Sequence, residues 1–348
     1  MLKPFNKKVA GLCLLLIFLL SACDNQAPQA KYPFVYSDGI MGTSFTIKAS
    51  HLPETVKHEL LKTQIKSLLD GLNAELSTYE SQSALSLFNQ NQSVDWESVP
   101  SALLTVLTES QRISQLSAGA FDITVGKLVN LWGFGVDPMN FTAPEETILN
   151  EALVNTGYQH LVIDAETSKI KKDLPELYLD LSAIAKGYAV DKVALFLEEQ
   201  GINDYMVEIG GEVRLKGKNI NQGAWRIAIE KPTPEKRMIQ KVVPLSNISM
   251  ATSGDYRNFF ESKGIRYSHT IDPRTGRPIT HKLASVTILS DTAMTADALA
   301  TAMMVLGEEQ GYQLAEKQQI AALFIIKTAD GFEEKSTAAF IEFFKEKP

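Results

Sequence analysis

An apolar run close to the start is the first pattern along the chain. Residues 9–20 (VAGLCLLLIFLL) are apolar, and Lys3, Lys7 and Lys8 precede them with no acidic residue nearby. A helix needs about 20 apolar residues to cross a bilayer, so this run is too short to span one and is typical of a secretory signal peptide. We therefore expect residues 1–22 to be removed from the mature protein.

Apolar residues with helical spacing follow at five places in the body. Pro144 precedes one of these segments and Gly201 follows another, as expected at the two ends of helices. The predicted helices cover residues 54–76, 101–113, 145–155, 182–200 and 292–318, the last being one helix or two with a break near Gly307.

Short alternating segments predict more strands than helices. The predicted strands cover residues 43–50, 161–164, 169–172, 205–209, 213–215, 225–229, 242–245, 265–271, 285–289 and 322–326. Because strands outnumber clean β–α–β alternation, the expected fold class is α+β, with mixed or antiparallel sheets and flanking helices. No internal repeat or low-complexity block divides residues 34–348, so we expect them to form one domain.

Composition places the body among ordinary globular proteins. Of the 348 residues, 45% are hydrophobic and 22% are charged, which allows a sizeable core. The net charge of −7 leaves no basic surplus for nucleic acid, where phosphate neutralisation supplies most of the affinity. Both cysteines, Cys13 and Cys23, lie in the first 23 residues, so we expect the body to fold without a disulfide or thiolate metal ligands.

The residues around the second cysteine predict a membrane anchor. Residues 20–23 (LSAC) resemble the lipobox of bacterial lipoproteins, in which the cysteine thiol accepts a diacylglycerol and becomes the new N-terminus. A plain secretory signal with an incidental cysteine is the alternative. Asp24 resembles the signal that retains enterobacterial lipoproteins in the inner membrane. We expect a lipid anchor at Cys23, a polar tether over residues 23–33 and a location on the periplasmic face of the inner membrane.

Generic nucleotide and hydrolase signatures are absent from the sequence. It contains no GxxxxGK[ST], HExxH or GxSxG motif, and the GFG of residues 133–135 lacks the third glycine of a dinucleotide fingerprint. Ser182 and Lys186 are four residues apart, whereas an S-x-x-K nucleophile motif needs a spacing of three. Any chemistry must therefore come from a less generic set of residues.

A first polar segment, residues 180–188 (DLSAIAKGY), follows apolar residues 177–179, which we predict to end a strand. In the simplest interpretation Asp180 or Ser182 caps the following helix. Alternatively, the junction presents free amides and the positive end of the helix dipole to an anion. Lys186 would then add a charge suited to phosphate.

A second polar segment, residues 249–256 with 268–278, contains a tight turn and a histidine. The DPRTG of residues 272–276 predicts a β-turn, which explains those residues without any function. It does not explain His269 just before the turn. Histidine exchanges protons near neutral pH, so His269 is either a structural residue or a candidate catalytic one.

A third segment, residues 296–301 (ADALAT), places two oxygen-bearing side chains on one helix face. Asp297 and Thr301 are four residues apart, and their neighbours are small. A carboxylate and a hydroxyl suit Mg²⁺, which prefers oxygen ligands and often takes only one or two carboxylates plus phosphates. Alternatively, Asp297 is paired or solvated and Thr301 packs in the core.

Together these segments resemble the FAD:protein FMN transferase family, the ApbE-type periplasmic flavin transferases. The resemblance extends from about Gly39 to the C-terminus and implies an ApbE-like fold, with residues 34–348 as the catalytic domain. Each signature is weak alone, and their joint occurrence in this order is specific. The matching residues are 41–43 (MGT), 77–79 (STY), 121–126 (FDITVG), 131–135 (LWGFG), 180–187, 210–211 (GG), 252–254 (TSG), 268–269 (SH), 271–273 (IDP) and 296–297 (AD).

The resemblance implies a Mg²⁺-dependent cleavage of FAD at its pyrophosphate, with FMN passing to a threonine hydroxyl of a target protein and AMP leaving. Some family members carry an acid just before the threonine of the metal face, where this chain has Ala300, so the number of metal ions stays open. His269 matches the family histidine that acts as general base. The FAD site would be lined by Met41, Tyr79, Ala120, Phe121, Asp122, Asp180, Lys186 and Ile271, and Mg²⁺ would be held by Asp297, Thr301 and the carbonyl of Ala183.

Targets in this family are flavin-bearing subunits of ion-pumping NADH:quinone oxidoreductases and of Rnf-type complexes. These lie in the inner membrane, where Asp24 would retain the protein. Three alternatives stay open from the sequence: a Mg²⁺-dependent FAD pyrophosphatase that uses water in place of threonine, a flavin-storing lipoprotein without turnover, and a structural envelope lipoprotein.

Overall fold

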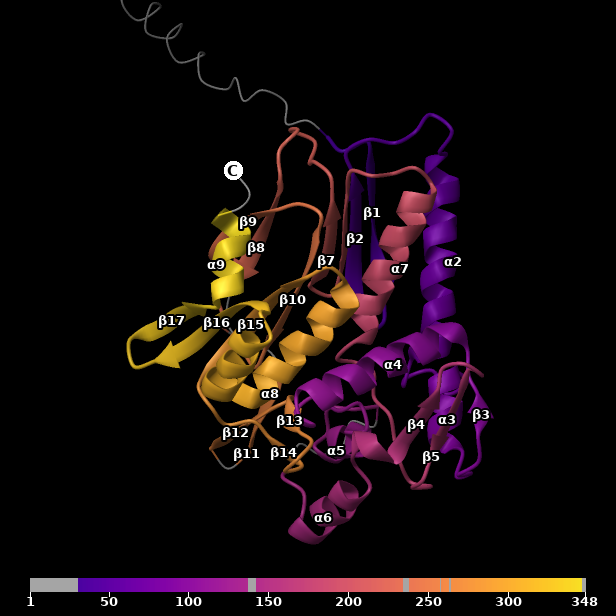
Figure 1. The fold of residues 1–348 in the computed structure, drawn as a ribbon, viewed down its shortest axis with the longest axis vertical. Coiled ribbons are helices and arrows are strands. Elements are labelled where there is room, and N and C mark those ends of the chain that lie inside the picture. The colour runs from indigo at the N-terminus through magenta and orange to yellow at the C-terminus, as the bar shows by residue number, and fades with distance from the viewer. Residues whose placement is uncertain (1–30, 137–141, 234–237, 257, 263, 346–348) are drawn as a thin grey trace, which may run out of the picture. The chain divides into compact units, whose positions relative to one another are not determined.

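An eight-stranded sheet runs through the computed structural model, which describes residues 31–136, 142–233, 238–256, 258–262 and 264–345 (Figure 1). Each pair of neighbouring strands is antiparallel. In order across the sheet, the strands are β1 (Phe34–Ile40), β2 (Thr43–Ala49), β6 (Tyr205–Ile209), β7 (Glu212–Lys216), β10 (Ile248–Gly254), β15 (Leu283–Ser290), β16 (Ala321–Thr328) and β17 (Gly331–Ser336).

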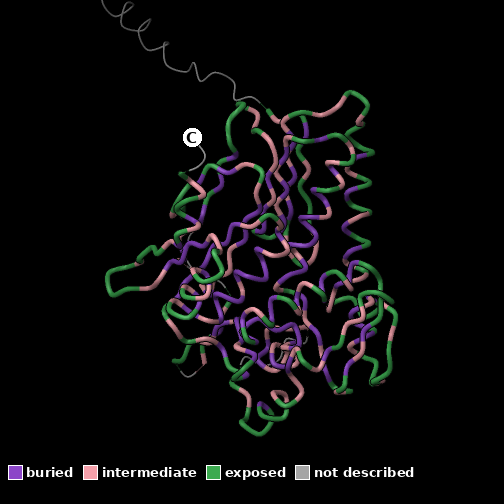
Figure 2. The backbone as a smooth tube through the Cα atoms, viewed as in Figure 1, coloured by how far each residue is buried: buried purple, intermediate pink, exposed green. Residues whose placement is uncertain are grey.

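The two faces of this sheet pack against different layers, because successive side chains of a strand point to opposite sides. On β16, Phe324 belongs to one buried cluster, whereas Leu323 and Ile325 belong to another. The buried backbone in Figure 2 follows the strands and the helices beside them. The first cluster includes residues of α2 (His58–Leu76), α4 (Ser101–Leu116), α7 (Ala185–Glu199) and α8 (Ala293–Lys317), and the second includes residues of β8 (Trp225–Glu230), β9 (Ile239–Leu245) and α9 (Ala338–Lys345).

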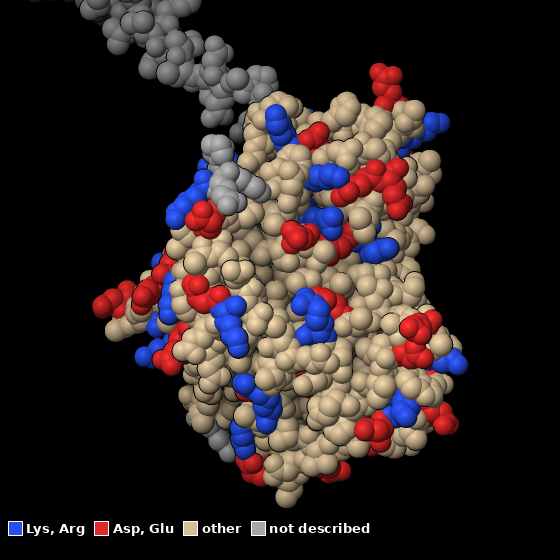
Figure 3. Space-filling view, viewed as in Figure 1, with Lys and Arg blue, Asp and Glu red and all other residues tan. Residues whose placement is uncertain are grey.

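The shorter elements and the loops between them lie near the start of α7 (Figure 1). On the face drawn in Figure 3, acidic and basic side chains are interspersed. The shorter elements are α3 (Ala84–Gln90), β3 (Glu97–Ser98), α5 (Gly126–Leu131), α6 (Glu146–Val154), the 3₁₀ turn η1 (Tyr158–His160), β4 (Leu161–Asp164), β5 (Lys169–Lys172), β11 (Phe259–Ser262), β12 (Ile265–Ser268), β13 (Ile271–Asp272) and β14 (Arg277–Pro278).

The α+β class predicted from the sequence is confirmed, and most predicted elements are present within a few residues of their expected bounds. The hairpin expected over residues 161–164 and 169–172 is formed by β4 and β5. The break expected near Gly307 divides α8, because Gly307 has a φ of 79° and a ψ of −175°.

The predictions for the segment before α7 are wrong in two respects. The expected strand at residues 177–179 is reduced to one parallel bridge between Tyr178 and Val125. The helix begins at Ala185 instead of residue 182, because a tight turn precedes it: the amides of Ile184 and Ala185 both donate to the carbonyl of Leu181, at 3.1 and 2.8 Å.

One further prediction is wrong beyond β10. The strand expected over residues 265–271 divides into β12 and β13, because the amide of His269 donates to Asn258 and that of Thr270 donates to the Ser268 hydroxyl. The strand predicted at residues 322–326 is confirmed as β16, and β17 and α9 follow it.

Tyr32 packs onto the body of the unit to which it belongs. One compact unit begins at Tyr32, whose ring stacks on Trp225 with the centroids 5.6 Å apart. The predicted signal peptide, Cys23 and Asp24 lie outside the described residues. Among the helices that the structure describes, none combines the length and the apolarity needed to cross a bilayer.

Candidate active site where α7 meets α8

Two helices meet at Gly187 without room for a side chain. A Cβ atom there would lie 2.3 Å from the carbonyl oxygen of Ala293 and 2.8 Å from the Cα of Met294. The Gly187 amide donates to Oδ2 of Asp297 at 3.1 Å. The glycine therefore lets the first turn of α7 contact the first turns of α8, and places the Asp297 carboxylate against the α7 backbone.

Asp191, one turn further along α7, fixes the start of α8. Its two carboxylate oxygens accept the amides of Ala293 and Met294 at 3.0 and 2.8 Å. Arg214 of β7 donates to the same carboxylate at 2.7 Å. Since the first amides of a helix have no intrahelical partner, this carboxylate satisfies two of them and sets the direction of α8.

Lys186 lies between two buried carboxylates beside this contact. Its Nζ is 3.7 Å from Oδ2 of Asp297 and 3.7 Å from Oε1 of Glu212, and it donates to the Ser182 carbonyl at 3.0 Å. Burial alone would lower the pKa of Lys186, but the charges of Asp297 and Glu212 outweigh it and raise that pKa. The lysine is therefore fully charged at neutral pH.

Burial raises the pKa of both carboxyl groups above that of an exposed acid. Burial raises the pKa of Glu212 to about 8, although the charge of Lys186 acts in the opposite direction. Burial also raises the pKa of Asp297, again against the charge of Lys186. Both groups would be more readily ionised beside an additional positive charge.

Glu212 is a site residue that the sequence analysis missed. The signal that could have found it is the double glycine just before it, Gly210-Gly211, which was noted only as a family signature. Gly210 has a φ of 64°, and a Cβ atom there would lie 3.1 Å from Cδ of Lys186. The glycine thus leaves room for the lysine stem, and the chain then delivers Glu212 to the lysine head.

The turn between β1 and β2 lies next to Gly210. Met41 and Gly42, its central residues, both have positive φ values, 49° and 71°. The methyl group of Thr43 lies 3.0 Å from where a Gly210 Cβ would be. The turn that contains the predicted FAD residue Met41 therefore ends, at Thr43, beside Gly210 and the stem of Lys186.

In the loop at residues 120–124, the Asp122 carboxylate binds protein groups. Asp122 Oδ1 accepts the Thr124 amide and hydroxyl at 2.8 and 2.7 Å, and its Oδ2 accepts the Tyr158 amide at 2.7 Å. Burial raises the pKa of Asp122. Ala120 and Phe121 are 0% and 1% exposed. The Asp122 carboxylate therefore has a clear structural task, joining this loop to the loop before β4.

Asp180 connects the same loop to the start of α7. Its amide donates to the carbonyl of Ile123 at 2.7 Å, and its Oδ1 accepts the amide of Ser182 at 2.8 Å. The interpretation of Asp180 or Ser182 as the cap of α7 is wrong, because Ile184 occupies the cap position and makes no side-chain cap bond. The predicted FAD residue Tyr79 is 68% exposed, so its ring is open to a ligand.

His269 has a defined proton arrangement. Its Nδ1 lies 2.9 Å from the backbone carbonyl of Asn258, and a carbonyl only accepts, so Nδ1 carries the proton and Nε2 keeps a free lone pair. Burial lowers the pKa of His269; the charge of Lys186 acts in the same direction and that of Asp255 opposes it. The ring is therefore neutral at pH 7, as a general base requires.

The expected turn after His269 is confirmed. The amide of Gly276 donates to the Asp272 carbonyl at 2.8 Å, and Gly276 has a φ of 70°. The turn connects β13 and β14, where the predicted FAD residue Ile271 pairs with Pro278. Ile271 is buried in the cluster that contains Trp132 and Phe260.

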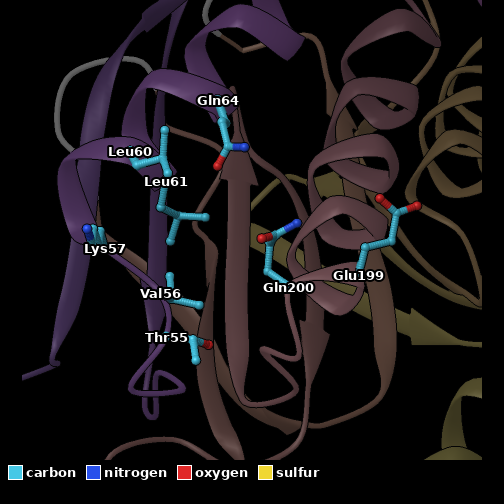
Figure 4. A pocket seen from close by; sticks show the side chains of 8 residues that line it. All are labelled: Thr55, Val56, Lys57, Leu60, Leu61, Gln64, Glu199 and Gln200. Carbon is cyan, nitrogen blue, oxygen red and sulfur yellow. The ribbon is translucent and has the colours of Figure 1, made fainter.

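A hollow of about 290 Å³ lies next to the predicted FAD residues. It is lined by Asp122, Gly119 and Tyr158 on one side and by Pro273 and Arg274 on the other. A larger hollow of about 370 Å³ lies between α2 and the last turn of α7 (Figure 4). None of the predicted site residues lines this second hollow, which is at the opposite end of α7 from Lys186.

The oxygen atoms near Lys186 fit a hard divalent cation. Asp297 and Thr301 are one turn apart on α8, and Ala183 lies in the turn before α7. Two buried carboxylates face a single lysine, and Oε2 of Glu212 is buried without a hydrogen-bond partner in the part of the chain that the structure describes. No group of three His, Cys, Asp or Glu that could hold a metal ion occurs in that part, and Asp297, Thr301 and the Ala183 carbonyl offer only oxygen donors, the kind that Mg²⁺ prefers.

Comparison with known proteins assigns the family. Residues 41–324 match the model of the ApbE family. A FAD:protein FMN transferase of Vibrio cholerae is 48% identical over 94% of this chain and 96% of its own length, and one of Haemophilus influenzae is 43% identical over 96% and 97%.

Solved structures agree with the sequence comparison. The flavin transferase ApbE of Vibrio cholerae superimposes with a TM-score of 0.83 at 47% identity, covering 89% of this chain and 98% of that one. The apo form of Pseudomonas stutzeri flavinyl transferase ApbE gives 0.82 at 39% identity, covering 89% and 96%. The chain belongs to the ApbE family.

Proposed function

We propose that this protein cleaves FAD at its pyrophosphate and transfers FMN to a threonine hydroxyl of an acceptor protein, with Mg²⁺ bound and AMP released. Its relatives are FAD:protein FMN transferases, and the same reaction class follows for this chain. The observation that carries the proposal is the convergence of Lys186, Asp297 and Glu212 at the start of α7.

The start of α7 supplies a binding site for the FAD phosphates. Lys186 provides a fixed positive charge, and the first turn of α7 provides the positive end of a helix dipole. The amides of Ala185 and Gly187 already donate to the Leu181 carbonyl and to Asp297, so the Lys186 charge and the helix dipole supply the attraction for the phosphates. Tyr79, exposed near Asp180, provides an aromatic face for one of the flat rings of FAD.

Asp297, Thr301 and the Ala183 carbonyl would hold Mg²⁺. When bound, the ion neutralises phosphate charge that develops as the pyrophosphate is cleaved. Ala300, 1% exposed, offers no further carboxylate on this face, which supports a single ion held by Asp297 alone among the acids of α8.

His269 acts as the general base of the transfer. Nε2 takes the proton of the acceptor threonine hydroxyl, the hydroxyl oxygen forms a bond to the phosphorus of the FMN half, and the anhydride bond to the AMP half breaks. AMP leaves with the electron pair of that bond. The Asn258 carbonyl keeps Nδ1 protonated throughout, so Nε2 stays the proton-accepting atom.

We further propose that Cys23 carries a lipid anchor and that Asp24 keeps the protein on the periplasmic face of the inner membrane. The acceptors are then flavin-bearing subunits of ion-pumping NADH:quinone oxidoreductases or Rnf-type complexes, which lie in that membrane. Labelling cells with a radioactive fatty acid tests the anchor: label on the wild type and none on Cys23→Ser is expected, and equal label contradicts it.

An in-gel fluorescence assay tests the transfer itself. The purified protein is incubated with FAD, MgCl₂ and a candidate acceptor subunit, and covalent flavin is read on the denatured acceptor. We expect fluorescence that disappears with EDTA and with an acceptor whose threonine is replaced by valine. AMP release without flavin on the acceptor supports the pyrophosphatase instead, and FAD that stays intact supports flavin storage without turnover.

A further inference from the structure

An aromatic ring, that of Phe134, lies against the imidazole of His269. The ring centroid of Phe134 lies 6.3 Å from that of His269 at an interplanar angle of 71°, an edge-to-face arrangement. Phe134 belongs to the LWGFG segment, for which the reaction described above assigns no task. The imidazole of His269 therefore has two neighbours that restrict its orientation. The Asn258 carbonyl accepts from Nδ1, and the Phe134 ring packs against the imidazole edge-to-face.

Phe134 is itself held by the hairpin that leads to His269. Its ring lies 5.5 Å from that of Phe260 on β11, and Phe260 stacks on Tyr267 of β12 at 5.0 Å. Tyr267 in turn lies 5.3 Å from Trp132, two residues before Phe134. The LWGFG segment and the β11–β12 hairpin thus pack together through four aromatic rings.

Trp132 also fixes the chain on the other side of His269. Its Nε1 donates to the carbonyl of Gly276 at 2.8 Å in a buried position, at the end of the turn that follows β13. The segment 131–135 therefore contacts aromatic side chains of the hairpin before His269 and the backbone after it. The hydrogen bond is geometrically specific, whereas the ring contacts are broad and apolar.

We propose that Phe134 is a positioning residue for His269, which keeps the imidazole oriented on the Asn258 carbonyl with Nε2 directed to the acceptor hydroxyl. This inference rests on the proposed role of His269 as the base. The ring of Phe134 also excludes water from the imidazole, together with the hairpin. The charged groups that act on His269 are Asp255 and Lys186, and Arg266 is bound to the Asp255 carbonyl; Phe134 adds an uncharged wall.

The test compares Phe134→Leu with Phe134→Tyr in the full mature chain. The first removes the aromatic edge and the second keeps it. Phe340→Leu is the control, because Phe340 is a buried phenylalanine of α9 in the other buried cluster, away from His269. Imidazole ¹⁵N shifts of His269, assigned with a His269→Gln variant, report its tautomer and its titration without any activity measurement.

Phe134→Leu should raise the pKa of His269 and mix its two neutral tautomers, because water then reaches the ring. It should also lower kcat for FMN transfer about tenfold at neutral pH with the KM for FAD unchanged, a part of the ~10²–10⁴-fold that general bases contribute. Phe134→Tyr and Phe340→Leu should keep the wild-type ¹⁵N shifts and titration.

Unchanged ¹⁵N shifts and titration in a folded Phe134→Leu variant would overturn the positioning role. A misfolded Phe134→Leu variant is recognised by its circular dichroism, and the decision then passes to Trp132→Phe. That variant removes the bond to Gly276 and trims the ring that packs on Tyr267, which loosens the segment that holds Phe134, and unaltered His269 shifts in it contradict the proposal. Altered shifts with unaltered transfer rates would leave the positioning intact and refute His269 as the base, so the two failures are distinguishable.

Discussion

The start of α7 and the hairpin that carries His269 are held by different forces. At the start of α7, the contacts involve backbone groups and charges. Gly187 packs directly on the α8 backbone, the Asp191 carboxylate binds two amides of α8, and Lys186 lies between two buried acids. Around His269, aromatic rings pack on each other and one carbonyl binds the imidazole. The first region tolerates almost no change in shape, whereas the second depends on side chains that can be exchanged one at a time.

In the function proposed above, this difference separates binding from proton transfer. Phosphates and Mg²⁺ need charges at fixed places, which helices joined through backbone groups provide. A base needs a defined tautomer and limited water, which an aromatic cluster and one carbonyl provide. Changes near His269 should therefore reduce kcat, and changes where α7 meets α8 should reduce stability and FAD binding together.

The largest expected effect is on turnover in His269→Ala. We expect kcat for FMN transfer to fall by about 10²–10⁴-fold, because the hydroxyl loses its base, while the KM for FAD changes little. Steady-state kinetics with in-gel fluorescence measures both. A rise in the KM for FAD as large as the fall in kcat would show that His269 belongs to the binding region, and would remove the distinction between the two regions.

The next effect is the loss of stability in Gly187→Ala. The added Cβ would lie 2.3 Å from the Ala293 carbonyl oxygen, so α7 and α8 must separate, and we expect unfolding to require about 3 kcal/mol less, as overpacked cores do. FAD binding should weaken as well. Urea unfolding followed by circular dichroism measures the change.

Gly71→Ala is the matched control for that variant. Gly71 is an exposed residue of α2 with no atom within 4 Å of an added Cβ, so alanine should leave stability unchanged or raise it by up to ~1 kcal/mol through helix propensity. Equal stability of Gly187→Ala and Gly71→Ala would contradict the close contact between α7 and α8.

The smallest effect is a pH dependence that Glu212 imposes on stability without metal. Burial raises the pKa of Glu212 to about 8, above its unfolded value, so the folded protein binds the extra proton between about pH 5 and 8 and loses stability as the pH rises through this range. Glu212→Gln should lack this loss. Urea midpoints at pH 5.5 and 8.5 in EDTA should diverge with rising pH in favour of the variant, and parallel midpoints would contradict the buried, proton-binding state of Glu212.

How far the sequence predicts this molecule depends on the kind of interaction. Gly307 and the DPRTG turn were predictable, because glycine and proline act through local backbone geometry. The start of α7 was not, since the turn at residues 181–184 precedes it and Asp180 binds the distant carbonyl of Ile123. Long-range pairs of this kind leave no periodic trace in the sequence.

The same distinction applies to the candidate site. The spacing of Asp297 and Thr301 was sufficient to place both on α8. Glu212 was missed because the double glycine before it marks a tight turn but does not show that Lys186 of another element lies beside it. Asp122 was predicted to line the FAD site, and its carboxylate proves to bind Thr124 and Tyr158, which only the fold could show.

The most direct test of the account counts products in one reaction. Purified protein, FAD, MgCl₂ and an acceptor subunit are incubated, AMP is quantified by chromatography, and FMN on the acceptor threonine is quantified by mass spectrometry. We predict one AMP for each FMN-threonine with the wild type, and neither product when EDTA removes the metal or when Lys186 is replaced by methionine. AMP in step with free FMN, and an unmodified acceptor, would contradict the transferase.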